Sequence, residues 1–155
     1  MGYREWGQKV EMPKHPITNS IQGGYSMKII HLEDDGIKYS TIKRVLVDVG
    51  IRNEDIVWVN NVEDGIEQIE RAIKEGSPFD LAITDQHYPL KKGMKADFDA
   101  GEIFIDTIKN KGITLPIIVC SSMDLEYKNV YGTVWYSDRS NWEAEVQGYI
   151  KKLMR

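Results

Sequence analysis

From Met27 onward, short apolar runs alternate with segments in which apolar residues recur every three or four positions. The first pattern is typical of buried strands, and the second is typical of helices that pack on one face. Repeated strand and helix units predict one parallel sheet with right-handed crossovers and helices on both faces. We therefore expect an α/β fold with five strands, at 29–32, 56–59, 79–84, 115–120 and 133–136.

The helical stripes fill the gaps between these strands. The first begins at Ile37 and runs to Val49, and the others run through 66–73, 103–108 and 142–153. Glycine is frequent just after the last turn of a helix, because it adopts a backbone conformation that other residues avoid. Helix ends are therefore expected at Gly50, at Gly76 and near Gly112.

Polar residues follow three of the expected strands directly. Glu33, Asp34 and Asp35 follow the first strand, Asp85 follows the third and Ser121 follows the fourth. In an open α/β sheet these strand ends meet at one crevice. Grouped carboxylates favour a hard divalent cation such as Mg²⁺, and a lone aspartate there can attack a phosphoryl group whose charge the metal and a hydroxyl group stabilise. The spacing predicts phosphoryl chemistry on aspartate.

These residues resemble the receiver domains of two-component response regulators, over a stretch from Lys28 to about Leu153. Residues 28–35 are similar to the opening strand and acidic pair of that family, and 80–89 are similar to its phosphoacceptor strand and the loop that follows, with its proline. Residues 115–122 resemble the fourth strand. The resemblance implies a flavodoxin-like, doubly wound sheet with the strand order 2-1-3-4-5.

The resemblance also implies a role for each site residue. Asp85 would accept a phosphoryl group from a histidine kinase or a phosphotransfer protein. Asp34 and Asp85 would bind Mg²⁺ directly, Glu33 would bind it through water, and His87 would bind it through its backbone carbonyl. Ser121 would donate a hydrogen bond to the phosphoryl group.

Two features of the loop after Asp85 have two interpretations each. The His87 side chain either flanks an incoming water molecule or is an ordinary solvated loop residue. Lys91, Lys92 and Lys95 either steer a phosphodonor or an acidic partner toward the site, or are simply solvated. We favour the solvated interpretation in both cases, because exposed charges contribute little when isolated.

The fifth expected strand departs from the family, which has a lysine at its end. No lysine occurs between Asn129 and Ile150. In one register Tyr136 replaces the aromatic residue that switches in the family, and Arg139 replaces the lysine and supplies the cation. In the other register Ser137 ends the strand, and Arg139 is a solvated charge. The sequence leaves both registers open.

The segment between the fourth and fifth strands is short. Residues 123–130 leave room for little more than two helical turns, at about 3.6 residues each. The fourth helix is therefore expected to be short or irregular. In the family that helix belongs to the surface that relays phosphorylation, so partner recognition is expected to differ here.

Composition sets the domain organisation. A chain of 155 residues with 41% hydrophobic and 28% charged residues fits one globular domain with its own core. Residues 1–26 contain proline and glycine without sustained periodicity. They are expected to be an extension, either a leader or an arm that packs on the domain or on a partner. Residues 27–155 are the expected receiver domain.

Charge and cysteine content bound the cellular context. The net charge of -4 gives no global attraction to nucleic acid or to an anionic membrane, so neither is an expected partner. The single cysteine, Cys120, lies in an apolar run and is expected to be a buried small hydrophobic residue. Without a disulfide in the chain, a reducing compartment is favoured, and we expect a cytoplasmic protein.

The sequence thus predicts a phosphorylation-dependent signalling receiver. It would not be an enzyme beyond catalysing its own phosphotransfer and dephosphorylation. If the chain is complete, no output domain follows Leu153, and we then expect it to act through a downstream protein that the sequence does not identify. The alternative is a degenerate receiver that serves as an interaction module without phosphorylation, which the missing lysine favours and the intact acidic set opposes.

Two enzyme classes also place carboxylates at strand ends. Toprim-like phosphotransfer enzymes and nucleases need Asp-x-Asp at the third strand, where residues 85–87 read Asp-Gln-His. A haloacid-dehalogenase-like phosphatase needs Asp-x-Asp on the first strand, and the run 33–35 has the wrong spacing. Both classes are therefore disfavoured.

Overall fold

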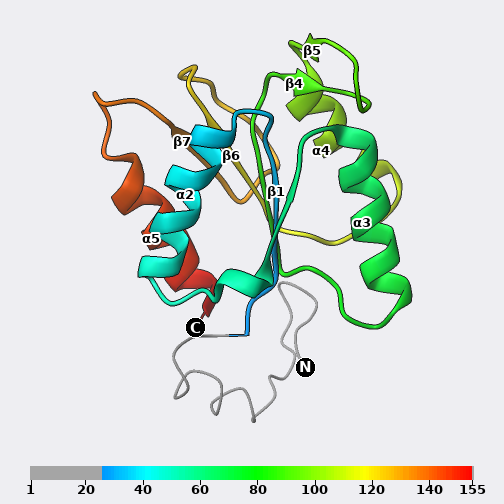
Figure 1. Ribbon diagram of the computed structural model, residues 1–155, viewed down its shortest axis with the longest axis horizontal. Helices are drawn as coiled ribbons and strands as arrows, with labels where there is room; N and C mark the ends of the chain where they lie inside the picture. The colour runs from blue at the N-terminus through cyan, green and yellow to red at the C-terminus, as the bar shows by residue number, and fades with distance from the viewer. Residues whose placement is uncertain (1–25, 155) are drawn as a thin grey trace.

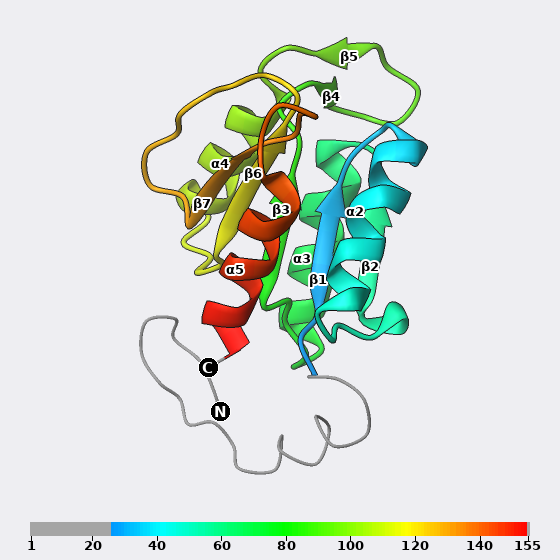
Figure 2. The ribbon, with the colours of Figure 1, turned by 90° about the vertical axis from the view of Figure 1, so that its left-hand side faces the viewer.

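The computed structural model describes residues 26–154, which form a parallel sheet between two layers of helices (Figures 1 and 2). The five strands are β1 (Ile29–Leu32), β2 (Ile56–Val59), β3 (Leu81–Thr84), β6 (Ile117–Ser121) and β7 (Gly132–Trp135). They lie in the order β2-β1-β3-β6-β7, and every neighbouring pair is parallel. This confirms the predicted doubly wound order.

Helices cover both faces of the sheet, as predicted. They are α2 (Gly36–Asp48), α3 (Val62–Lys74), α4 (Ala100–Asn110) and α5 (Trp142–Met154), with a 3₁₀ turn, η1 (Asn53–Asp55), before β2. Helix α2 packs beside α5 on one face, and α3 packs beside α4 on the other (Figure 2). No helix within residues 26–154 is long and apolar enough to cross a bilayer.

Alternate residues of each strand point to opposite faces, so the sheet has two cores. Ile29 of β1 belongs to the core under α2 and α5, and Ile30 belongs to the core under α3 and α4. Cys120 is buried in the first core, where burial raises the pKa of its thiol to about 12. It is therefore the buried apolar residue that was predicted.

Helix α2 begins and ends at residues that the sequence marks, an aspartate at its start and a glycine just after its end. The Asp35 side chain accepts hydrogen bonds from the backbone N–H groups of Ile37 and Lys38, at 2.9 and 3.2 Å. This is the usual way in which an aspartate begins a helix. The helix ends just before Gly50, whose φ of 111° is strained for a residue with a side chain. The stop predicted at Gly50 is confirmed.

The fourth helix of the expected fold is missing. Residues 122–131 connect β6 to β7 and contain no helix. The N–H of Tyr131 binds the carbonyl of Ile117 at 2.8 Å, so this segment must run back along all of β6. Five strand residues span about 16 Å, and ten helical residues would cover only about 15 Å with nothing left for the turns. The segment is therefore irregular throughout.

The loop after β3 contains a hairpin that the sequence analysis did not anticipate. Strand β4 (Tyr88–Pro89) pairs antiparallel with β5 (Ala96–Asp97) above the ends of the central strands (Figure 1). Lys91, Lys92 and Lys95 are exposed around its turn, and none forms an ion pair with another described residue. This agrees with the solvated interpretation. The extension predicted at 1–26 lies outside the described residues, except for Ser26.

Candidate functional site

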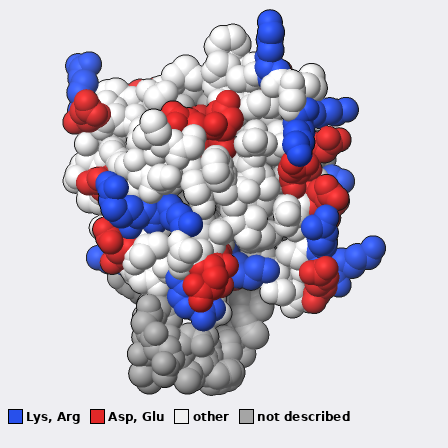
Figure 3. Space-filling model, viewed as in Figure 1, with Lys and Arg blue, Asp and Glu red and all other residues white. Residues whose placement is uncertain are grey.

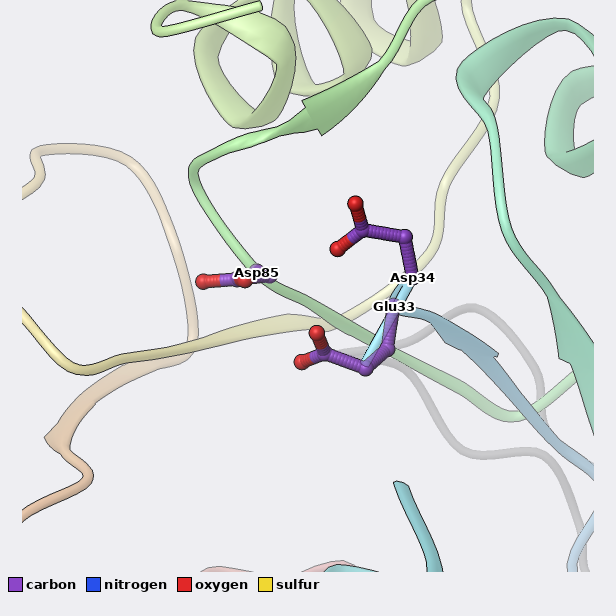
Figure 4. Close-up of side chains that lie close together, drawn as sticks. All are labelled: Glu33, Asp34 and Asp85. Atoms are coloured by element: carbon purple, nitrogen blue, oxygen red, sulfur yellow. The ribbon is translucent and has the colours of Figure 1, made fainter. Parts of the chain in front are cut away.

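Parallel pairing of β1 with β3 brings the predicted acidic residues together. Leu32 is in register with Thr84, so the residues that follow the two strands are neighbours. One carboxylate oxygen from each of Glu33, Asp34 and Asp85 lies within 4.8 Å of the other two. Figure 4 shows the three side chains pointing to the same side of the strand ends.

The carboxylates open into a pocket of about 310 Å³. It is lined by the acidic run and Asp85 together with residues from α2, the hairpin and the ends of β6 and β7: Glu33, Asp34, Asp35, Lys38, Asp85, His87, Phe98, Ser121, Ser122, Met123 and Tyr136. On the face shown in Figure 3, acidic atoms gather at this end of the molecule and are surrounded by uncharged atoms. The pocket contains all but one of the predicted site residues, and the exception is Arg139.

The three carboxylates differ in their access to water. Glu33 is 1% exposed, Asp85 is partly buried and Asp34 is exposed. Burial raises the pKa of Glu33 to about 7; Lys38 opposes this shift and the negative charge of Asp85 adds to it. The pKa of Asp34 is also raised, first by burial. The charged forms of Glu33 and Asp34 are thus disfavoured, and a bound cation would offset this.

This set of groups fits a hard divalent cation. All the donors are oxygens, and Asp34 faces solvent, so a bound ion could keep water ligands there. The Oε2 atom of Glu33 accepts a hydrogen bond from the N–H of Asp35 at 3.1 Å. Its Oε1 atom is buried without a hydrogen bond from any described residue, although the Lys38 ammonium lies 3.1 Å away. A buried oxygen in this position suits a ligand bound directly or through water.

The structure adds a residue that the sequence analysis missed, Lys38. Its Nζ atom lies 3.1 Å from Glu33 Oε1 and 3.2 Å from Asp85 Oδ1, and it donates a hydrogen bond of 2.9 Å to the carbonyl of Cys120. Burial alone would lower the pKa of Lys38, but the charges of Glu33 and Asp85 outweigh it and raise the pKa. A charged ammonium group is thus fixed inside the acidic pocket.

A sequence signal for Lys38 existed in the phase of its helix. Lys38, Ile42 and Leu46 are spaced four residues apart, and all three are buried. The prediction that the apolar stripe begins at Ile37 was wrong, because Ile37 is one position out of phase and 80% exposed. A lysine in phase with a buried stripe, one turn after an acidic run, was therefore the sequence signal for a buried cation beside these carboxylates.

Arg139 does not take the place of the family lysine. Strand β7 ends at Trp135, and the N–H of Tyr136 still pairs with the carbonyl of Ser121 at 2.7 Å. The chain then turns at Ser137, whose hydroxyl accepts a hydrogen bond from the N–H of Arg139 at 3.1 Å. The Arg139 side chain is exposed and forms no ion pair within residues 26–154. The exposure of Arg139 agrees with the register in which it is a solvated charge, although β7 ends at Trp135 rather than at Ser137.

Tyr136 and Ser121 do lie at the pocket. The Tyr136 ring packs against Trp142, with centroids 4.8 Å apart, and its centroid lies 5.1 Å from Lys38 Nζ. Ser121 is buried at the end of β6, and its hydroxyl oxygen accepts a hydrogen bond from the N–H of Met123 at 3.1 Å. Tyr136 therefore contacts Lys38, which pairs with the acidic cluster, and Ser121 contacts Met123 at the rim of the pocket.

His87 is less solvated than we favoured from the sequence. Its ring is half-buried and stacks on Phe98, with the two planes 8° apart and the centroids at 4.4 Å. Phe98 follows β5, and no sequence pattern predicts that its ring pairs with His87, because the pairing depends on the hairpin. The stack places an aromatic wall on the hairpin side of the pocket.

Gln86 was also missed, and it links three segments. Its N–H donates to Asp85 Oδ1 at 2.7 Å, and its side-chain amide donates to the carbonyl of Phe98 at 2.7 Å. Its side-chain oxygen accepts a hydrogen bond from the hydroxyl of Tyr127, in the segment that replaces the fourth helix. The residue after Asp85 thus ties the aspartate to the hairpin and to the irregular segment.

Comparison with known proteins shows the fold to which this site belongs. No family model and no curated protein matches the sequence. Solved structures do match, and the response regulator receiver protein from Pseudoalteromonas atlantica is one of them. It is 15% identical, with a TM-score of 0.59, and the match covers 81% of this chain and 94% of that chain.

Two further matches were solved in defined ligand or phosphorylation states. The phosphorylated cyanobacterial phytochrome response regulator RcpA is 18% identical, with a TM-score of 0.60, over 83% of this chain and 93% of that chain. The receiver domain of the histidine kinase CKI1 from Arabidopsis thaliana, complexed with Mg²⁺ and BeF₃⁻, is 13% identical, with a TM-score of 0.57, over 89% and 95%. At these identities the matches establish the fold: the chain folds as a receiver domain.

Proposed function

Because the chain folds as a receiver domain, we propose that it is a signalling receiver whose Asp85 accepts a phosphoryl group. The observation that carries the proposal is the convergence of Glu33, Asp34 and Asp85 within 4.8 Å in one pocket. Ser121 lines the same pocket from the next strand. A carboxylate nucleophile, a cation-binding acidic pair and a hydroxyl donor are thereby combined at the ends of neighbouring strands.

The acidic set would hold Mg²⁺. Asp34 and Asp85 would bind it directly, Glu33 through water, and the backbone carbonyl of His87 would complete the protein ligands. When bound, the ion would neutralise charge on the phosphoryl oxygens. The receiver domain of CKI1, which has the same fold, was solved with Mg²⁺ and BeF₃⁻, and this supports the choice of ion.

A hydrogen bond and an ion pair to Asp85 indicate which of its oxygens would react. Gln86 N–H and Lys38 Nζ both contact Oδ1, at 2.7 and 3.2 Å. Oδ2 accepts no hydrogen bond from any residue that the structure describes. We therefore assign Oδ2 as the nucleophile, while the two donors hold the carboxylate in a fixed orientation.

The donor would be the phosphohistidine of a histidine kinase or of a phosphotransfer protein. Oδ2 of Asp85 forms a bond to phosphorus as the bond between phosphorus and the histidine nitrogen breaks. That nitrogen keeps the electron pair of the broken bond. The Ser121 hydroxyl, whose oxygen accepts a hydrogen bond from the N–H of Met123, would donate its own proton in a hydrogen bond to a phosphoryl oxygen and so stabilise the product.

The chain would act through a protein partner rather than as an enzyme on an external substrate. Its chemistry would be limited to accepting the phosphoryl group and to losing it by hydrolysis. The irregular 122–131 segment, which Tyr127 ties to the residue after Asp85, is a surface through which a downstream protein could detect the change. Direct contact with nucleic acid or with a membrane forms no part of the proposal.

The test is the intact mass after incubation with Mg²⁺ and acetyl phosphate. Wild type should gain the mass of one phosphoryl group, and Asp85→Asn should gain none. Asp124→Asn, which removes an exposed charge next to Met123 on the rim, should behave as wild type. A wild-type chain that gains no mass while binding Mg²⁺ normally would instead support a receiver that works without phosphorylation.

A further inference from the structure

We propose that Lys38, supplied by helix α2, is the cation that binds the phosphoryl group on Asp85. The inference rests on the proposed function and adds the residue that neither the fifth strand nor Arg139 supplies. Its basis is the position of the Lys38 ammonium between the phosphoacceptor and the end of β6, where it contacts Asp85 and the Cys120 carbonyl at once.

The Lys38 side chain is held in one place. It is 6% exposed, so the ammonium cannot exchange its partners for bulk water without leaving the core. The ammonium donates a hydrogen bond of 2.9 Å to the Cys120 carbonyl and forms ion pairs with Glu33 and Asp85 at 3.1 and 3.2 Å. A lysine fixed in this way acts as a point charge that is ready before any ligand arrives.

Charge balance gives this cation a role beyond a structural ion pair. Lys38 is the only lysine or arginine among the residues that line the pocket in the described part of the chain. It shares one positive charge between two carboxylates, which leaves the pocket acidic. A phosphoryl group replaces the single charge of Asp85 with about two negative charges. Phosphorylation therefore increases the negative charge that a neighbouring cation has to balance, and the Lys38 ammonium already lies 3.2 Å from Asp85 Oδ1.

Lys38 also contacts the two groups that would report the change. The Cys120 carbonyl precedes Ser121 in β6, and the Tyr136 ring lies 5.1 Å from Nζ. An ammonium drawn toward phosphoryl oxygens would alter both contacts. The ends of β6 and β7 should thus respond to phosphorylation through Lys38.

The experiment compares Lys38→Met and Lys38→Arg with Lys43→Met at saturating Mg²⁺. Lys43 is a matched control, because it lies on the same helix over the Tyr39 ring, away from the pocket lining. Fluoroberyllate, an analogue of the phosphoryl group, is titrated while amide resonances of Ser121 and Tyr136 are followed. Loss of one charge-assisted contact should weaken fluoroberyllate binding by about 10- to 100-fold in Lys38→Met. Lys38→Arg should keep part of the affinity, and Lys43→Met should keep all of it.

Two results separate this inference from the proposed function. If wild type binds fluoroberyllate and Lys38→Met binds it equally well, with the same resonance shifts, Lys38 is not the cation. The same conclusion follows if Arg139→Ala, rather than Lys38→Met, loses the affinity. If wild type itself binds no fluoroberyllate, the proposed function fails and this inference fails with it.

A second measurement uses wild type alone, so it does not depend on whether a variant folds. In wild type, the side-chain ammonium resonance of Lys38 should shift on addition of fluoroberyllate, and that of Lys43 should not. An unchanged Lys38 resonance in a protein that binds the analogue would overturn the inference even if Lys38→Met failed to fold.

Discussion

The acidic cluster at the strand ends combines the carboxylates of Glu33, Asp34 and Asp85 with one buried ammonium group, and the balance among these charges determines what the pocket can bind. Burial raises the pKa of Glu33 to about 7, and Lys38 has only one charge to divide between Glu33 and Asp85. Asp34 has no share of that charge and faces solvent. The affinity of the pocket for a divalent cation should therefore depend strongly on the Asp34 carboxylate.

Replacing Asp34 by asparagine should weaken Mg²⁺ binding by on the order of 10- to 100-fold. A loss of this size is usual when a residue that only hydrogen-bonds to a metal ligand is replaced, and a direct ligand should matter at least as much. Asp124→Asn removes an equal charge from the pocket rim without a donor in the acidic cluster, so its effect should be small. Titration followed by tryptophan fluorescence measures both affinities. Equal losses in the two variants would show that Asp34 acts only through its charge.

A second residue, His31, gives the domain a pH dependence of its own. It lies in β1 with 1% exposure, and neither ring nitrogen has a hydrogen-bond partner within residues 26–154. Burial, aided by the nearby Lys38 charge, lowers the pKa of His31 to about 3. The unfolded chain takes up this proton below pH 6.5 and the folded chain does not. His31 therefore stabilises the fold above pH 6.5, and that stability is lost as the pH falls.

Without metal, the free energy of unfolding of wild type should fall relative to His31→Leu by about 2 kcal/mol between pH 7 and pH 5. Glu33 contributes in the opposite sense, because its raised pKa stabilises the fold at low pH and this stability is lost as the pH rises toward 7. It is present in both proteins, so it cancels in the difference. Urea denaturation at several pH values measures the two curves, and parallel curves would contradict the assignment to His31.

At the scale of elements, the start of α4 packs directly on the phosphoacceptor loop. Gly101 donates its N–H to the carbonyl of Gln86 at 3.0 Å. A Cβ atom added at Gly101 would lie 2.6 Å from the carbonyl oxygen of Asp85 and 3.0 Å from the Cα of Gln86. Backbone atoms cannot move aside as a flexible side chain can. The position of α4 is therefore coupled to the position of Asp85.

Gly101→Ala should destabilise the domain by about 1–3 kcal/mol, because the new methyl group overpacks this contact. Gly148→Ala is the matched control, since it lies in α5 with nothing within 4 Å of an added Cβ. It should stabilise the domain by about 0.5–1 kcal/mol, the usual gain from alanine inside a helix. Chemical denaturation compares the two. A neutral effect of Gly101→Ala would mean that α4 can shift away from the loop without cost.

At the scale of the molecule, the sequence predicted the features that follow from hydrophobic periodicity. It did not predict contacts in which a single side chain reaches from one helix or strand to another. The apolar runs located the five strands, and the acidic residues at their ends converge because parallel strands end at one edge of the sheet. Lys38 was missed because a helical stripe was read as apolar only. Arg139 stayed a candidate for the lysine position in one of two registers, because the pattern did not establish where β7 ends.

The irregular connection was predicted only in part, and for a geometric reason. The number of residues in 122–131 was visible, but the need to return along the whole of β6 appeared only with the contact between Tyr131 and Ile117. The hairpin was hidden because its strands are two residues each, too short for a periodic pattern. Gln86 was hidden because its role depends on the hairpin and on Tyr127.

The central claim is that Asp85, and no other residue, carries the phosphoryl group, and chemical mapping tests it most directly. Wild type treated with Mg²⁺ and acetyl phosphate is reduced with borohydride, which converts an aspartyl phosphate to homoserine, and the peptides are sequenced by mass spectrometry. We expect homoserine at position 85 alone. Homoserine at another aspartate, or a phosphoryl mass gain in the intact protein with unmodified Asp85, would contradict the account.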